Sequence, residues 1–74
     1  MTNLEKNILN AIDDANIGGK KVIINNIIDD KKHFFVKRTN KTLALYWGEE
    51  KVVTIDNNVY TVLAINIFKE YIKF

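Results

Sequence analysis

The sequence predicts an α+β domain of order α-β-β-β-β-α, in which the two terminal helices pack on one face of a four-stranded antiparallel meander. Three observations support this fold class: an amphipathic segment at the start, short β-branched runs separated by turn-forming residues in the middle, and a second helical spacing at the end. With 74 residues and neither a linker nor a repeat, the chain is expected to form a single compact domain over residues 1–74.

The N-terminal segment has the spacing of an amphipathic helix over about residues 3–16. Thr2 and Glu5 are three residues apart, which is the spacing of a capping box at a helix start. Gly18 and Gly19 follow the segment, and glycine accepts the left-handed conformation with which helices often end. The expected apolar stripe consists of Leu4, Ile8, Ala11, Ile12 and Ala15.

Short runs of β-branched and aromatic residues predict four strands in the middle of the chain. The expected strands are residues 21–28, 33–39, 42–47 and 51–55. The expected turns are residues 29–31, 40–41, 48–50 and 56–58. Because these turns are too short for crossover connections, neighbouring strands should pair antiparallel.

The segment at 59–63 allows two interpretations, since Val59, Tyr60 and Val62 could continue as the return arm of a hairpin. A helix is favoured, with Thr61 as its N-cap and Lys69 near the C-terminal end, where the helix dipole favours cations. The residues that recur at helical spacing are Leu63, Ala64, Ile67, Phe68, Tyr71 and Ile72.

Alternation along the last three strands divides their side chains between two faces. The set expected to face the helices is Phe34, Val36, Leu43, Leu45, Trp47, Val53 and Ile55. The opposite set is His33, Phe35, Lys37, Thr39, Thr42, Ala44, Tyr46, Val52 and Thr54. If no helix covers this second set, its aromatic residues form a contact surface. The first strand is apolar on both sides, so the pattern does not orient it.

Charge is unevenly distributed along the chain. Five basic residues and no acidic one lie in residues 31–41, whereas the rest of the chain has six basic and nine acidic residues. Aromatic rings among cations on an exposed sheet suit single-stranded nucleic acid, because bases stack on rings while ammonium groups meet phosphates. Lysines at sheet edges also simply prevent aggregation. The candidate partner-binding residues are His33, Phe35, Lys37, Arg38, Lys41 and Tyr46.

The sequence offers no recognisable catalytic, metal or cofactor motif. It has no Cys and no Ser, and its single histidine, His33, has no second ligand at metal spacing. An enzyme is the third hypothesis, and it would need an acid–base pair such as Asp30 with His33. Since small domains outside the cytoplasm are usually disulfide-bonded, a cytoplasmic location is expected.

These observations favour a small non-enzymatic protein-interaction domain, of adaptor or inhibitor type, whose partner is another protein or a second copy of itself. The alternative is single-stranded nucleic-acid binding through the basic and aromatic strand face of residues 31–46. No run of about 18 apolar residues predicts a membrane span. Eleven Ile, ten Lys and ten Asn against one Arg indicate an AT-rich gene, which fits a phage or another mobile element.

Overall fold

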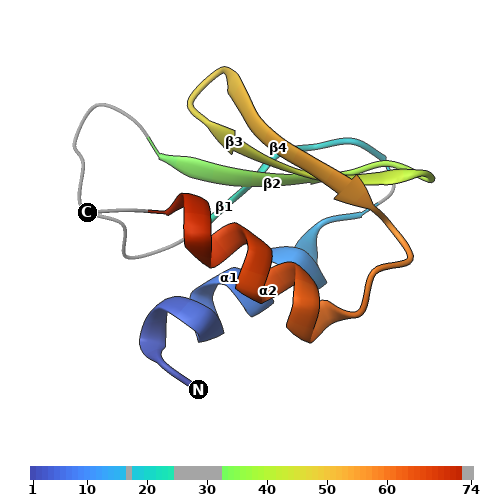
Figure 1. Cartoon of the computed structure of the whole chain (residues 1–74). Coiled ribbons are helices and arrows are strands. Elements are labelled where there is room, and N and C mark those ends of the chain that lie inside the picture. The colour runs from blue at the N-terminus through green and yellow to red at the C-terminus, as the bar shows by residue number, and fades with distance from the viewer. Residues whose placement is uncertain (17, 25–32, 73–74) are drawn as a thin grey trace.

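A computed structural model describes residues 1–16, 18–24 and 33–72 of the chain. It confirms the expected α+β order and places both helices on the same face of the sheet (Figure 1). The elements are α1 (Asn3–Asp14), β1 (Val22–Ile23), β2 (Phe34–Arg38), β3 (Thr42–Trp47), β4 (Glu50–Asp56) and α2 (Thr61–Tyr71). All neighbouring strands pair antiparallel in the order β1-β2-β3-β4.

Helix α1 begins with the expected capping box. The Glu5 backbone N–H donates to the Thr2 hydroxyl at 3.1 Å, and the Thr2 backbone N–H donates to the Glu5 carboxylate at 2.8 Å. The expected stripe is also confirmed, because Ile8, Ala11 and Ile12 are buried. The helix ends at Asp14, two residues earlier than predicted, since Ala15 already has extended dihedral angles.

The strands agree with the sequence pattern to within a residue or two where the structure describes them. Strand β3 has the predicted bounds, β2 is one residue shorter at each end, and β4 is one residue longer at each end. Of the first predicted strand, β1 contains only Val22 and Ile23, and the Ile24 N–H also donates to the Phe34 carbonyl. Residues 25–32, including the predicted turn at 29–31, lie outside the described residues.

A β-bulge in β4 changes which side chains reach the face of the sheet opposite the helices. Leu45 lies opposite Val53 and Tyr46 lies opposite Lys51, so Val52 is the extra residue. Strict alternation predicted that Val52 would point away from the helices, but it packs against the core, and that prediction is wrong. The bulge instead sets Lys51 beside Tyr46.

The core lies between the sheet and the two helices. Val36 and Leu45 of the sheet are fully buried against Ile8 of α1 and Phe68 of α2. The predicted inner set is confirmed, and Trp47 extends the core by packing on Phe34 with 4.5 Å between ring centroids. The structure also orients β1, because Val22 packs against the core while Ile23 is exposed.

Helix α2 is confirmed, but its start and its buried face differ from the prediction. The N-cap is Tyr60 rather than Thr61, and no side chain caps the helix. The buried residues of the helix are Ala64, Ile65 and Phe68, followed by Ile72 after its end. Leu63 and Tyr71, which the spacing placed in the core, are exposed, because the helix turns Ile65 rather than Leu63 inward.

Neither helix in the described part of the chain combines the length and the apolar character needed to cross a bilayer.

Candidate interaction surface

The face of the sheet opposite the helices, here called the outer face, carries one continuous row of side chains across all four strands. Ile23 of β1 lies opposite Phe35 of β2, Phe35 lies opposite Tyr46 of β3, and Tyr46 lies opposite Lys51 of β4. Both helices lie on the other side of the sheet, so neither covers this row (Figure 1). In the part of the chain that the structure describes, Ile23 and Lys51 of this row are exposed, whereas Phe35 and Tyr46 are half-buried.

Three lysine side chains surround the ring of Tyr46. The ammonium nitrogens lie 4.7 Å (Lys21), 6.0 Å (Lys37) and 6.0 Å (Lys51) from the ring centroid. The Lys21 ammonium also lies 5.8 Å from the centroid of Phe35. Ring quadrupoles attract cations at these distances, so the lysines are drawn together over the aromatic residues. We call these five residues the lysine–aromatic cluster.

His33 extends the lysine–aromatic cluster at one end. Its ring meets the ring of Phe35 edge to face, with 6.4 Å between centroids and 79° between planes. Aromatic pairs favour this geometry, since the positive edge of one ring meets the negative face of the other. The imidazole thus prolongs the aromatic row beyond the first residue of β2.

The position of Lys21 depends on the turn between β3 and β4. Its ammonium donates to the Gly48 carbonyl at 3.2 Å and forms a 3.3 Å ion pair with Glu49. Gly48 has φ 62°, which suits the first position of a two-residue hairpin turn. Because the Glu49 side chain is fully exposed, this ion pair contributes little to stability. The Lys21 ammonium is thus held beside the Tyr46 ring by a backbone carbonyl and by a weak ion pair that an anionic partner could replace.

Few carboxylates balance the lysines of the cluster. Apart from Glu49, the described acidic residue with a register position on this face is Asp56, opposite Thr42 at the far end of the sheet. Its carboxylate accepts a hydrogen bond from the Asn58 backbone N–H. The centre of the outer face is thus positively charged, over a floor formed by the buried Ala44.

The structure brings four of the six sequence-predicted candidates together and separates the other two. His33, Phe35, Lys37 and Tyr46 lie on the outer face. Lys41 is exposed in the turn between β2 and β3.

Arg38 lies on the side of the sheet that faces the helices, where it caps helix α1. Its guanidinium donates to the carbonyls of Ala15 at 3.0 Å and Ile12 at 3.1 Å, and to the side-chain oxygen of Asn57. The last turn of α1 contains no basic residue, so Arg38 supplies the positive charge that the helix dipole favours there. It is therefore committed to the fold rather than to the outer face.

Sequence reasoning missed two members of the cluster, Lys21 and Lys51. Lys21 could not be placed because the first strand is apolar on both sides. Lys51 was missed because period-two alternation puts it on the same face as Val53, and only the bulge at Val52 reverses this. The length of the turn after Trp47 offered one signal, because a two-residue turn fixes which residues of β4 lie opposite those of β3.

Among the described residues, no group of three or more His, Asp or Glu side chains could hold a metal ion. Comparison with protein-family models, with curated proteins and with solved structures finds no match to this chain. The interpretation of the outer face accordingly depends on its own chemistry.

Proposed function

We propose that this protein is a non-enzymatic interaction domain, of adaptor or inhibitor type, that binds an acidic segment of a partner protein through the outer face. The observation that supports the proposal is the set of three ammonium groups within 4.7–6.0 Å of the Tyr46 ring centroid. Carboxylates of the partner would meet these groups, while an apolar side chain would cover Phe35 and Ile23. Such pairing of complementary charge mainly sets specificity and the rate of association.

The chain is large enough to offer an interface of ordinary size. A typical specific interface takes about 800 Å² from each partner. The chain exposes 5021 Å² in total, so such an interface would take roughly a sixth of its surface. Aromatic residues are enriched at the centre of such interfaces, whereas lysine is depleted there, so the aromatic residues of the outer face and not its lysines match the usual composition.

The test compares capture of host proteins by charge variants. Lys37→Glu and Lys51→Glu reverse two charges of the cluster, whereas Lys6→Glu makes the same change on exposed α1. A protein that binds the outer face should be captured by wild type and by Lys6→Glu, and lost with both cluster variants. Equal capture by all four proteins would contradict the proposal.

Single-stranded nucleic acid is the second candidate, favoured by the alternation of rings and ammonium groups on an open sheet. Contacts from three lysines to phosphates predict a log–log slope of binding against salt of about −2. Fluorescence anisotropy with a labelled oligothymidylate at two salt concentrations measures this slope. No binding at low salt would eliminate this candidate and would leave the proposed binding of an acidic protein segment unaffected.

The expected cytoplasmic location and the phage or mobile-element origin belong to the same proposal. The absence of cysteine and the Ile, Lys and Asn bias support them. The neighbouring genes provide the check, because an anti-host cluster would fit an inhibitor and a replication operon would fit the nucleic-acid candidate.

A further inference from the structure

Lys21 differs from the other lysines of the lysine–aromatic cluster because its ammonium group is held on several sides. The ammonium lies 4.7 Å from the ring centroid of Tyr46 and 5.8 Å from that of Phe35, and it donates to the Gly48 carbonyl at 3.2 Å. These contacts come from β2, β3 and the turn after β3. The Lys21 side chain is only 28% exposed. The ammonium is therefore fixed in position by the fold itself.

A carboxylate of the same chain occupies the open side of this ammonium. Glu49 Oε2 lies 3.3 Å from Lys21 Nζ, at the end of a side chain that is fully exposed. An ammonium group has three N–H donors. Here one donor meets the Gly48 carbonyl, and the Tyr46 ring lies on another side. A second carboxylate would therefore compete with Glu49 for Lys21.

We propose that Lys21 anchors the acidic segment of the partner, and that Glu49 is an internal competitor that one of the partner's carboxylates displaces. This inference rests on the proposed function. The ion pair is asymmetric, because the cation is held by two rings and a backbone carbonyl while the carboxylate is exposed. Exposed ion pairs are weak, so Glu49 leaves at little cost. The site for the incoming carboxylate is then already formed, which favours binding.

A partner outcompetes Glu49 because it reaches more of the cluster. In the part of the chain that the structure describes, Glu49 pairs with Lys21 alone. The ammonium groups of Lys37 and Lys51 each lie 6.0 Å from the same Tyr46 ring centroid. A segment with several carboxylates meets all three lysines, so that each contact raises the effective concentration of carboxylate at the next.

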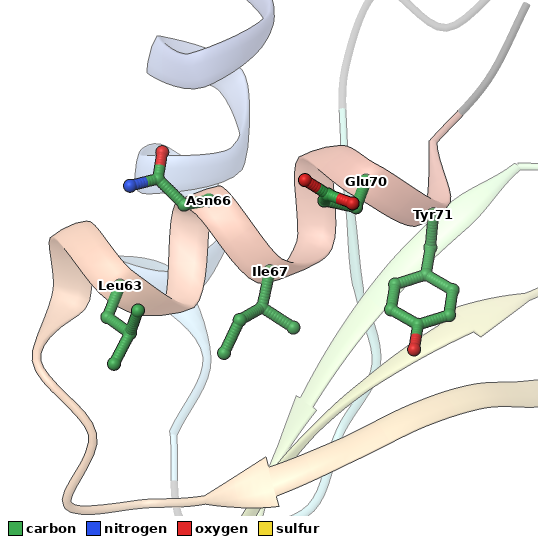
Figure 2. Close-up of a pocket in the computed structure, with 5 residues that line it drawn as sticks. All are labelled: Leu63, Asn66, Ile67, Glu70 and Tyr71. Atoms are coloured by element: carbon green, nitrogen blue, oxygen red, sulfur yellow. The ribbon is translucent and has the colours of Figure 1, made fainter.

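A hollow on α2 offers the acidic segment no such anchor. Figure 2 shows Leu63, Ile67 and Tyr71 pointing in the same direction from the helix. Asn66 and Glu70 complete the lining, and the charged residue among these five is an acid. A carboxylate would be repelled there, so binding of an acidic peptide reports on the outer face.

Fluorescence anisotropy with a labelled hexaglutamate peptide tests the proposal at about 0.1 M salt, where charges more than about 10 Å apart are largely screened. Glu49→Gln should bind the peptide about two- to fivefold more tightly than wild type, because it removes the competitor from a weak exposed ion pair. Glu50→Gln is the matched control, since Glu50 follows Glu49 but lies opposite Trp47, which packs against the core. Glu70→Gln makes the same change in net charge on α2. Both controls should bind as wild type does.

A double-mutant cycle assigns the effect to the pair of Lys21 and Glu49. Lys21→Gln should weaken binding by at least about threefold, and Glu49→Gln should have no further effect in that background. If wild type binds the peptide but Glu49→Gln binds no more tightly than Glu50→Gln, this inference is overturned and the proposed function stands. If neither wild type nor Glu49→Gln binds the peptide, both are overturned.

NMR of the Lys21 side chain gives a readout that needs no partner. Protons above aromatic rings resonate upfield, so the side-chain methylene protons of Lys21 should lie upfield of those of the exposed Lys6. We expect this shift to persist in Glu49→Gln, because the two rings and the backbone carbonyl still hold the ammonium. Loss of the shift would overturn the role of Glu49 as a competitor, since Glu49 would then be the residue that positions Lys21.

Discussion

Arg38 is the residue on which the junction between α1 and the sheet depends. Its guanidinium satisfies two carbonyls at the end of α1 and joins them to Asn57. A methionine at this position keeps the apolar stem but leaves these partners without a charged donor. We expect Arg38→Met to lower the free energy of unfolding by about 2 kcal/mol, as for lost hydrogen bonds to a charged group. Urea unfolding at neutral pH measures the change.

The neighbouring residue supplies the control. Lys37→Met makes nearly the same change in size and charge, but Lys37 lies on the outer face and contacts Tyr46 only as a cation near its ring. Its stability should stay within about 0.5 kcal/mol of wild type, as for most surface substitutions. Comparable losses in the two variants would show that the Arg38 contacts contribute nothing specific.

The pair Lys37 and Arg38 shows where sequence reasoning about the site succeeds and where it fails. Side chains alternate between the two faces along β2, so Lys37 shares a face with Phe35 and Arg38 shares the other face with Val36. The separation of Lys37 from Arg38 could therefore have been predicted. The partner of Arg38 could not, because Ile12 and Ala15 come from a helix more than twenty residues away. A run of charged residues is visible in the sequence, but the sequence does not show which distant residues each charge contacts in the folded chain.

At the scale of elements, Glu5 joins the start of α1 to the last turn of α2. The pKa of its carboxyl is lowered to about 2, chiefly by the hydrogen bond from the Thr2 backbone N–H and then by the Lys69 ammonium. A carboxyl with a lowered folded-state pKa stabilises the fold above its unfolded pKa. This contribution is complete above about pH 4.5 and is lost as the pH falls toward 2.

Glu5→Gln tests this linkage. The stability difference between wild type and Glu5→Gln should be constant from pH 7 to about pH 5 and should shrink as the pH is lowered to 2. Chemical denaturation at several pH values measures the difference, and carbon-detected NMR titration of Glu5 gives the pKa directly. A difference that does not change with pH would show that the ionised carboxylate is not the stabilising form.

Gly48 is the residue that the hairpin between β3 and β4 requires. Its φ of 62° is left-handed, and a side chain at such an angle costs about 1–2 kcal/mol. We expect Gly48→Ala to lower the free energy of unfolding by about 1 kcal/mol, measured by urea unfolding. Gly18→Ala is the control, because Gly18 does not have a positive φ and no atom lies within 4 Å of an added Cβ. Equal effects at both positions would contradict the assignment of strain to the turn.

Local signals predicted the elements well because each depends on nearby residues. The capping box, the β3 bounds and the tight turns follow from spacing alone. The bulge at Val52 and the rotation of α2 did not follow, because both are set by how elements pack. Apolar residues lie on both sides of α2, so periodicity could not decide whether Leu63 or Ile65 faces the core.

At the scale of the whole molecule, three positive charges lie close together on the outer face of the sheet. The ammonium groups of Lys21, Lys37 and Lys51 all lie within 6.0 Å of one ring centroid. Any two of them are therefore within about 12 Å, close to the Debye length of about 10 Å at 0.1 M salt. At low ionic strength they repel one another, apart from the partial compensation of Lys21 by Glu49. The free protein thus retains an electrostatic repulsion between these lysines, which an anionic partner would reduce.

This repulsion predicts how the stability of the fold responds to salt. Sodium chloride should raise the thermal midpoint of wild type more than that of Lys51→Gln, because the variant has less repulsion to screen. Between about 20 mM and 0.5 M salt, the difference in response should be about 1–2 °C, which corresponds to a few tenths of a kcal/mol. Effects of salt on the remaining ion pairs are shared by both proteins and cancel in the comparison.

Lys6→Gln distinguishes the cluster from net charge. It removes the same charge from exposed α1, on the opposite side of the sheet from Tyr46. Scanning calorimetry on the three proteins should therefore show a reduced salt response only for Lys51→Gln. If Lys6→Gln reduced the response equally, the repulsion would belong to the molecule as a whole, and the outer face would have no electrostatic character of its own to offer a partner.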